Sequence, residues 1–348
     1  MGVCEDCGRI LAIGSAVGPD TDLGFLVSAA GFEWSLMIAV TMGFGEPFGR
    51  LAALAARAVR EMTGLETVVL DGTHFAASGL PHPHHLKLRI FDHVDDDAVL
   101  YFDSDIVCLK PWDPTRFARP DALVVVTDIP HGGTIRACQD WNIPIREFFN
   151  AGFMILNRRC HRDWLRETER LIKANPNVSA FQSTDQTALN VTRCRFGLKL
   201  ELIDRRYNWL AFGRGSLCYQ VPVFMAHTLV QENKAANIDF FEGRYQPPFN
   251  WHIEIDEAEM ARLKNETLCI KGGPWEKPLR LNSDGTIGLP PYPGGGRHWF
   301  VHTKSGSRRL AIASEEEILR EFIPVSEGVW ESVQELLPEP DRASVQPN

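Results

Sequence analysis

Two carboxylates stand at the end of a short apolar run in the first third of the chain. Val99–Trp112 reads VLYFDSDIVCLKPW, so Asp103 and Asp105 follow a segment that suits a strand buried on both faces. Open α/β sheets place their ligands at the carboxyl ends of such strands. On an ideal strand the two side chains point to the same side, and a local turn would let them share one ion. We therefore expect a site for Mg²⁺ or Mn²⁺ with a phosphorylated substrate, the alternative being an Asp turn that only ends a strand.

Other polar residues lie at the ends of later predicted strands and helices. In FFNAGFMILN, Gly152 lets a ligand approach the backbone, and the Asn150 amide can donate and accept hydrogen bonds. Asp185 opens a helix in STDQTALN, where its simplest role is to complement the helix dipole. His227 ends the last predicted strand of this block. Two carboxylates and one imidazole can form an octahedral divalent site that leaves positions for phosphate oxygens.

The elements that must position these residues follow from the apolar periodicity. A strand at Trp34–Thr41, a helix at Phe48–Met62 and a strand at Leu65–Leu70 form a β–loop–helix–β unit, and Gly64 ends the helix. The remaining predicted elements are strands at Leu123–Thr127, Phe148–Asn157, Leu200–Asp204 and Val221–Ala226, and helices from about His84, at Trp164–Lys173 and from Ser183 or Thr184. We expect an α/β fold with a mostly parallel central sheet flanked by helices.

Changes in amino-acid composition along the sequence divide the chain into four parts. Residues 1–33 are small and Gly-rich, with an uncertain role, and residues 34–240 carry the predicted catalytic domain. Pro, Gly and Trp then become frequent, so we expect a loop-rich extension at 241–338, with a helix at Glu315–Phe322 and a disordered tail at 339–348. Three tryptophans of the extension could contact an acceptor sugar or simply belong to a core: Trp251, Trp275 and Trp299.

Composition narrows the classes of function. A net charge of −9 over 348 residues argues against broad attraction to nucleic acid or to anionic membrane. There is no apolar run of membrane-spanning length and no signal-peptide pattern, so we expect a cytoplasmic protein without a transmembrane segment. The eight cysteines are scattered and are expected to be reduced; Cys4 and Cys7 could begin a zinc knuckle or a redox pair, but no second pair follows. We interpret His82, His84 and His85 as solvated loop residues rather than metal ligands.

The ordered set of motifs resembles the retaining glycosyltransferases of family 8, the glycogenin and lipopolysaccharide galactosyltransferase group, which has the GT-A fold. The resemblance runs from about Trp34 to Ala235 and rests on YFDSDIVCLKPW, FNAGFMILN, STDQTALN, Tyr207-Asn208 and the late His227. It implies metal-dependent transfer of a hexose from a nucleotide sugar, UDP-glucose or UDP-galactose by family habit. The acceptor, whether a glycan, a protein or a small molecule, is left open.

The resemblance also implies roles for individual residues. Asp103, Asp105 and His227 would hold Mn²⁺ or Mg²⁺. The residues that would contact the donor are Thr41, Lys87, Ser104, Gly152, Asn208 and Lys234, and those at the reacting sugar are Asn150, Asp185 and Gln186. Asp185 would bind sugar hydroxyls, and Gln186 would face the anomeric carbon. In the family a Gly and a Lys-Pro-Trp follow the metal His, whereas here TLVQENKAA follows His227, so Lys234 is the candidate phosphate lysine and the closing loop differs.

The sequence leaves open two reaction routes and three other classes of function. In a same-face reaction the leaving phosphate accepts the acceptor's proton, whereas a covalent route would use Asp185 as nucleophile. A nucleotidyltransferase or a nucleotide-sugar hydrolase could use the same metal. The former usually has a Gly-rich basic segment after the first strand, and Met42–Arg50 holds a single Arg. A catalytically silent relative that binds a sugar or a partner is the non-enzymatic alternative.

Overall fold

The structure is a computed structural model. It describes residues 37–129, 132–176, 178, 184–210, 222–229, 233–245, 253–272, 275–288, 298–313 and 318–333. Several predictions fall outside these ranges, namely those for residues 1–33 with Cys4 and Cys7, for Trp251 and for the tail at 339–348. Nothing is described for the side chain of Trp275 either.

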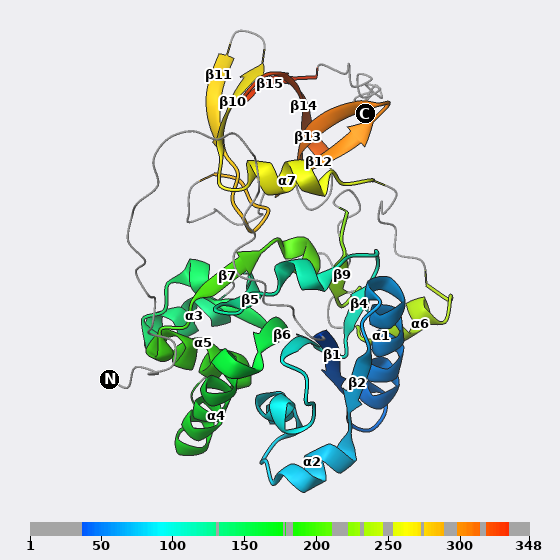
Figure 1. The fold of residues 1–348 in the computed structure, drawn as a ribbon, viewed down its shortest axis with the longest axis vertical. Coiled ribbons are helices and arrows are strands. Elements are labelled where there is room, and N and C mark those ends of the chain that lie inside the picture. The colour runs from blue at the N-terminus through cyan, green and yellow to red at the C-terminus, as the bar shows by residue number, and fades with distance from the viewer. Residues whose placement is uncertain are drawn as a thin grey trace, which may run out of the picture. The chain divides into compact units, whose positions relative to one another are not determined.

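Strands and helices alternate through the first part of the chain (Figure 1). Its strands are β1 (Met37–Met42), β2 (Thr67–Leu70), β3 (Ala98–Phe102), β4 (Ile106–Cys108), β5 (Leu123–Thr127), β6 (Phe149–Asn157), β7 (Leu200–Ile203), β8 (Trp209–Leu210) and β9 (Met225–His227). Its α-helices are α1 (Phe48–Thr63), α2 (Gly72–Ser78), α3 (Gly132–Trp141), α4 (Arg158–Ala174), α5 (Thr184–Phe196) and α6 (Ala235–Phe241). Short 3₁₀ segments are η2 (Pro83–Asp92), η3 (Pro114–Phe117), η4 (Ile145–Glu147) and η5 (Arg205–Tyr207).

The central sheet has six strands in the order β2-β1-β3-β6-β5-β7. β1 runs parallel to β2 and β3, and β5 runs parallel to β7, whereas β6 is antiparallel to both of its neighbours. The predicted α/β fold with a parallel-rich sheet is therefore confirmed, with β6 as the reversed strand. β3 and β6 are buried along their whole length, which agrees with their continuous apolar runs.

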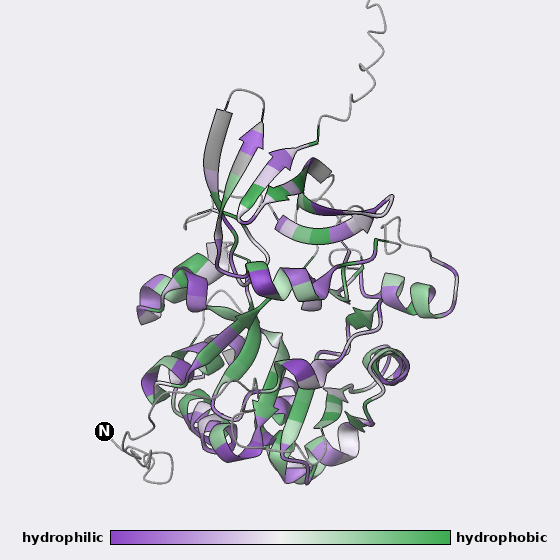
Figure 2. Ribbon diagram, turned by 45° about the horizontal axis from the view of Figure 1, so that its top comes forward, coloured by the Kyte–Doolittle hydropathy of each residue, from purple (hydrophilic) through white to green (hydrophobic). Residues whose placement is uncertain are grey.

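Both faces of this sheet are covered, because successive side chains of a strand point to opposite faces. Leu100 of β3 packs with the α1 residues Ala55 and Val59 on one face. Tyr101, its neighbour, packs on the other face with η2, α4 and α5, for example with Trp164. The strands are mainly hydrophobic while the helices are mixed, as Figure 2 shows. This double layer places the carboxyl ends of β1 and β3 at one edge of the sheet.

A second, three-stranded sheet in the order β4-β9-β8 completes this edge. β4 continues from the Asp103–Asp105 turn, and its first residue Ile106 pairs with His227 of β9. The register therefore brings His227 beside Asp105, although more than a hundred residues separate them in the chain.

Most predicted elements of the first part are present with small shifts. α1 begins at Phe48 as expected and ends at Gly64, which has the left-handed conformation of a helix C-cap (φ 74°). β5 matches its predicted range Leu123–Thr127. The last strand is shorter than the predicted Val221–Ala226, with β9 confined to Met225–His227.

The extension differs from the prediction of a loop-rich region. Its described part contains α7 (Glu257–Leu263) and a six-stranded sheet in the order β11-β10-β15-β14-β13-β12. The strands are β10 (Thr267–Gly272), β11 (Trp275–Arg280), β12 (His298–Lys304), β13 (Ser307–Ala313), β14 (Ile318–Ser326) and β15 (Val329–Ser332). The prediction of loops relied on Pro/Gly-rich runs, one of which, at residues 289–297, directly precedes β12 in the sequence.

The prediction of a helix at Glu315–Phe322 is wrong. Ile318–Ser326 forms β14, in which Phe322 pairs with Leu310 of β13 and with Ser332 of β15. Pairing on both sides and the complete burial of Phe322 outweigh the helix propensity of the acidic and leucine residues. Pro324 would also be costly inside a helix.

The extension and the first part share a hydrophobic core. Val107 and Trp209, from the first part, pack in one cluster with Leu263, Trp299 and Phe300 of the extension. Trp299 is buried, and its indole N–H donates to the Asn282 carbonyl at 3.0 Å. Trp299 is therefore a core residue rather than an aromatic face open to a sugar.

Two further expectations concern the membrane and the thiols. Among the described helices, none is both long enough and apolar enough to span a bilayer. Cys108 and Cys138 are buried thiols. Burial raises the pKa of Cys108 to about 12 and that of Cys138 to about 11, so both stay protonated at neutral pH.

Candidate active site

The predicted motif residues meet in one cavity of about 390 Å³ at the carboxyl end of β1 and β3. Its charged and polar lining consists of His84, Lys87, Asp103, Ser104, Asp105, Asp185, Gln186, His227 and Lys234. The rest of the lining is apolar or small: Met42, Gly43, Phe44, Phe48, Pro83, Ala151 and Gly152. The cavity thus combines charged and apolar groups, which suits a ligand that has both kinds of surface.

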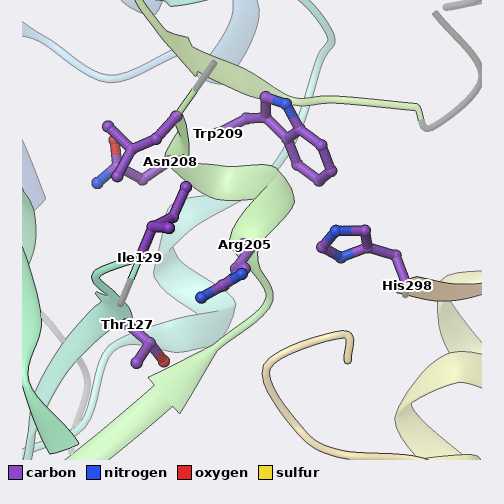
Figure 3. A pocket seen from close by; sticks show the side chains of 7 residues that line it. Thr127, Ile129, Arg205, Asn208, Trp209 and His298 are labelled. Carbon is purple, nitrogen blue, oxygen red and sulfur yellow. The ribbon is translucent and has the colours of Figure 1, made fainter. Parts of the chain in front are cut away.

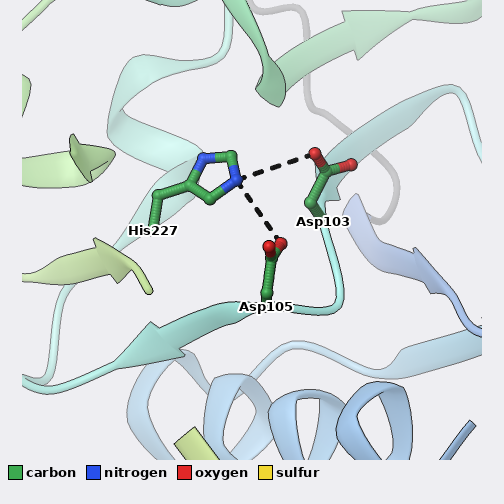
Figure 4. A group of neighbouring side chains, drawn as sticks. All are labelled: Asp103, Asp105 and His227. Atoms are coloured by element: carbon green, nitrogen blue, oxygen red, sulfur yellow. Dashed lines mark ion pairs between the residues drawn. The ribbon is translucent and has the colours of Figure 1, made fainter. Parts of the chain in front are cut away.

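Asp103, Asp105 and His227 form a compact cluster (Figure 4). Each offers one ligand atom, and these atoms lie within 4.8 Å of one another. His227 Nε2 is 3.4 Å from Asp105 Oδ1 and 3.9 Å from Asp103 Oδ2. Two carboxylate oxygens and one imidazole nitrogen on one side of a cavity fit a divalent cation that keeps open coordination positions.

The backbone holds this cluster together from two segments. After β3 the chain turns at Asp103, where the Ile106 N–H donates to the Asp103 carbonyl at 3.0 Å. The Asp105 carbonyl accepts from the Thr228 N–H at 2.9 Å and from the side-chain amide of Asn237 at 2.6 Å. The two aspartates therefore leave strand geometry and converge on His227.

Gly152 is required by the close approach of these side chains. A Cβ atom added at this position would overlap the His227 ring and would lie 2.9 Å from Asp103 Oδ2. Gly152 also accepts the Asp103 N–H on its carbonyl at 2.9 Å. The small residue predicted for ligand approach thus makes room for two of the candidate metal ligands as well.

Lys87 joins two of the carboxylates at the floor of the cavity. Its Nζ lies 2.8 Å from Asp185 Oδ2 and 3.4 Å from Asp103 Oδ1, and only 3% of the residue is exposed. Burial alone would lower the pKa of Lys87, but Asp103 and Asp185 hold it well above its usual value. In the same way, burial would raise the pKa of Asp185, but Lys87 lowers it overall. Both groups are therefore charged.

Lys234 lies on the other side of the cluster, with Nζ 2.8 Å from Asp105 Oδ2. Burial would raise the pKa of Asp105, yet His227 and Lys234 together lower it below its usual range. Three carboxylates, of Asp103, Asp105 and Asp185, face two lysines in the cavity. With His227 neutral the lining carries a net charge of −1, which a divalent cation would change to +1.

A chain of buried hydrogen bonds lies behind the cavity wall. His227 Nδ1 is 3.1 Å from Asn208 Oδ1, and the Asn208 amide donates to Asn150 Oδ1 at 2.9 Å. The Asn150 amide in turn donates to Asp128 Oδ1 at 3.3 Å, and the Gln186 amide donates to Asp128 Oδ2 at 3.1 Å. This network joins a candidate metal ligand to Gln186, because Asp128 accepts from both amides.

The structure brings most predicted site residues together, with differences for three of them. Thr41 is buried in β1 and is not part of the cavity lining, to which the next residues, Met42 and Gly43, belong. Asn150 and Asn208 lie in the network behind the wall rather than in the lining. Of the three histidines interpreted as solvated loop residues, His82 and His84 are exposed, although His84 also lines the cavity, whereas His85 is buried, which corrects that interpretation for His85.

Two buried residues of the site were missed by sequence reasoning. Asp128, which directly follows the predicted strand Leu123–Thr127, was not proposed for the site, and neither was Asn237, which binds the backbone at Asp105 and Leu229. The position of Asp128 directly after a buried strand was a usable signal, since Asp103 was found in the same way. No sequence pattern identified Asn237.

Among the comparisons with known proteins, matches come from solved structures alone. No family model matches the sequence, and no curated protein does either. The galactosyltransferase LgtC, solved with donor and acceptor sugar analogs, is 15% identical, with 62% of this chain and 99% of that chain covered and a TM-score of 0.43. The glycosyltransferase GlyE of Streptococcus pneumoniae TIGR4 is 12% identical, with 68% of each chain covered and a TM-score of 0.41. Mouse xyloside xylosyltransferase 1 is 10% identical, with 50% and 87% covered and a TM-score of 0.38.

Proposed function

We propose that this chain is a metal-dependent, retaining glycosyltransferase that moves a hexose from a uridine diphosphate sugar to an acceptor. The observation that carries the proposal is one cavity in which Asp103, Asp105 and His227 cluster beside the Lys87–Asp185 pair. The order of the motifs in the sequence, which resembles that of family 8, supports the same assignment. Glucose or galactose is the proposed sugar, and Mn²⁺ or Mg²⁺ the proposed ion.

The charge of the cavity supports a need for the cation. Without the ion the lining has no net positive charge to offer a diphosphate: Asp103, Asp105 and Asp185 outweigh the two lysines when His227 is neutral and balance them when it is protonated, and Asp105 raises the pKa of His227. A divalent ion on Asp103, Asp105 and His227 would make the site positive and, as a Lewis acid, stabilise charge on the leaving phosphate. The aromatic rings of Phe44 and Phe48 in the lining offer a surface for the nucleobase.

Lys234 would stabilise the negative charge that forms on the leaving phosphate when the bond to the sugar breaks. When the bond between the anomeric carbon and the diphosphate breaks, its electron pair stays on the phosphate, and Lys234 would balance the new charge. In the proposed same-face reaction the leaving phosphate takes the proton of the acceptor hydroxyl. That route needs no separate protein base, in agreement with the absence of an unpaired carboxylate among Asp103, Asp105 and Asp185.

Asp185 and Gln186 are proposed to hold the sugar. Lys87 binds the Asp185 carboxylate at 2.8 Å and makes it a weaker nucleophile, which favours a role in binding hydroxyls over the covalent route. Gln186 is fixed at both ends, since its carbonyl accepts from the Ala151 N–H at 3.1 Å and its amide donates to Asp128. A fixed carbonyl oxygen suits the face of an oxocarbenium-like sugar.

The test is turnover of UDP-glucose and UDP-galactose by the purified protein, with and without Mn²⁺. We expect Mn²⁺-dependent release of UDP that increases with a mixture of candidate acceptors, and an α-linked product by NMR. Water as the only acceptor would favour a nucleotide-sugar hydrolase, and an inverted product would contradict the retaining assignment. If nucleotide binds but no donor is turned over, the silent binding relative becomes the better explanation. The buried thiols of Cys108 and Cys138 fit a reducing compartment, so we retain the cytoplasm as the proposed location.

A further inference from the structure

A second, smaller pocket lies between the first part of the chain and the extension (Figure 3). Thr127 ends β5, Arg205 belongs to η5, and His298 begins β12 of the extension. The other residues that line it are Ile129, Asn208, Trp209 and Leu210. The pocket has a volume of only about 10 Å³, which admits one group of the size of a water or a single oxygen.

Three polar atoms of this pocket are buried without a hydrogen-bond partner among the described residues. They are Thr127 Oγ1, Arg205 Nε and His298 Nε2. Thr127 and His298 are more than nine-tenths buried, at 6% and 3% exposure. Buried polar groups in proteins are nearly always hydrogen-bonded, so three such atoms in the residues around one small space indicate a missing ligand group.

The charge in the pocket is positive. The Arg205 guanidinium has one long hydrogen bond, from Nη2 to the Asp128 carbonyl at 3.4 Å, and no ion pair with any described carboxylate. Its neighbour Arg206 shows the contrast, because it binds both oxygens of Asp204 at 2.9 and 2.8 Å and so uses the nearest acid. Burial lowers the pKa of His298 to about 3, so the imidazole is neutral and can offer one N–H or one lone pair. No carboxylate lines the pocket.

The pocket also adjoins the proposed reaction site. Asn208 lines it, and the side chain of Asn208 contacts Asn150 and His227. Thr127 precedes Asp128, whose carboxylate accepts from Gln186. Asn208 thus connects the pocket to His227, so a group held in the pocket would contact the same network that holds this candidate metal ligand.

We propose that Arg205, Thr127 and His298 bind an anionic oxygen, of a carboxylate or a phosphate, carried by the acceptor substrate. A guanidinium with a free Nε–H suits oxyanions, and a hydroxyl and a neutral imidazole can complete the hydrogen bonds. The small volume admits the tip of the anionic group, while the rest of the acceptor stays outside. This assignment rests on the proposed glycosyltransferase function, since it names the acceptor class for the same site.

The first experiment uses inorganic phosphate and acetate as probes, titrated into the wild-type protein and into Arg205→Gln by calorimetry. Of the two probes, we consider the one that binds the wild type more tightly. We expect Arg205→Gln to bind it at least about tenfold more weakly, because one charge-assisted hydrogen bond is lost. Arg136→Gln is the matched control, because it removes the same charge from an exposed ion pair on α3 and should leave binding unchanged. Thr127→Val keeps the charge and removes the hydroxyl, so it should weaken binding by several-fold even if Arg205→Gln folds poorly.

Two outcomes would overturn the proposal: no binding of either probe to the wild type, or equal binding by Arg205→Gln and the wild type. The ratio of phosphate to acetate affinity separates the two sources of the anion. Titration of UDP with Mn²⁺ into the same proteins separates this proposal from the general function. Arg205→Gln should retain that affinity within about twofold, since Arg205 is not part of the donor cavity. If the wild-type protein itself does not bind UDP with Mn²⁺, the glycosyltransferase assignment is refuted instead.

With donor turnover established, the acceptor class is tested directly. Glucuronate, glucose 6-phosphate and glucose differ in the presence and kind of anionic group. We expect an anionic sugar to stimulate UDP release more than glucose, and Arg205→Gln to remove that preference. Equal stimulation by glucose in both proteins would contradict the assigned acceptor class.

Discussion

Two clusters of charged side chains in this molecule are built differently. In the extension, Glu321 of β14 lies 2.6 Å from His302 Nε2, 2.8 Å from Arg309 Nη1 and 3.4 Å from Lys304 Nζ. One acid thus faces three basic groups on adjacent strands, and none of them lines a described cavity. In the donor cavity, three acids face two lysines around open space.

The difference teaches where to look for a ligand. The Glu321 cluster joins β12, β13 and β14 and leaves no excess of negative charge, so its effect is on stability. The cavity keeps an excess of negative charge and a cluster of ligand atoms that converge on one point. Buried charge alone is therefore a weak sign of function, whereas buried charged groups that converge on one point at the wall of a cavity are a strong one.

The largest effect is expected from Asp105→Asn. The change removes one charged ligand from the proposed metal cluster and the partner of Lys234, so Mn²⁺-dependent UDP affinity should fall by at least about a hundredfold, two charge-assisted contacts being lost. Calorimetry with the purified variant measures it. Asp121→Asn, which removes an exposed acid paired with Lys199, is the control and should bind as the wild type does. Wild-type affinity in Asp105→Asn would make the cavity cluster as structural as that of Glu321.

Gly152→Ala should reduce Mn²⁺ affinity about tenfold or more without removing any ligand atom. The new Cβ would displace the His227 ring and press on Asp103, and misplaced ligands bind a metal less well. Mn²⁺ binding followed by electron paramagnetic resonance gives the affinity. At Gly49 an added Cβ meets nothing within 4 Å, so Gly49→Ala is the matched control. Equal metal affinity in the two variants would show that the ligands are not held where the structure has them.

Asp128→Asn tests whether the network behind the wall positions Gln186. An amide cannot accept from Asn150, Gln186 and Thr134 at once, so Gln186 would lose its fixed orientation. We expect kcat to fall about 10- to 100-fold, as for a displaced positioning group, while the KM for the donor changes little. A purely structural role would lower the melting temperature and leave kcat of the folded enzyme unchanged.

The smallest effect on function is expected from Glu321→Gln. Removing the acid leaves His302, Arg309 and Lys304 facing one another, so the free energy of unfolding should fall by about 1–3 kcal/mol for this largely buried cluster. Denaturant unfolding measures that change. Affinity for UDP with Mn²⁺ should stay at the wild-type value, and a loss of affinity would remove the distinction between the two clusters.

The same contrast explains what the sequence could predict. Buried strands such as β3 and β6 leave continuous apolar runs, so the polar residues that end them, Asp103 among them, could be located from the chain alone. In the extension, β12 alternates less clearly in HWFVHTK, and the Pro/Gly-rich runs nearby favoured loops. Tertiary pairing, which decides such strands, leaves little local pattern.

The network behind the cavity could not be predicted for a related reason. Asp128, Asn150 and Gln186 come from different elements, and only the packing of α5 against β6 brings them together. A single sequence carries no signal for hydrogen bonds between distant segments. The metal cluster could be predicted from the sequence because each of its members lies at or near the end of a strand, and the sheet brings strand ends together.

The most direct test of the account is calorimetric titration of UDP into the wild-type protein with and without Mn²⁺, followed by other nucleoside diphosphates. We expect binding that requires Mn²⁺ and is strongest for UDP, because the cation gives the cavity a positive charge before the diphosphate enters. Equal binding in the presence of a chelator, or no binding of any nucleotide, would contradict it and would reduce Asp103, Asp105 and His227 to a structural cluster.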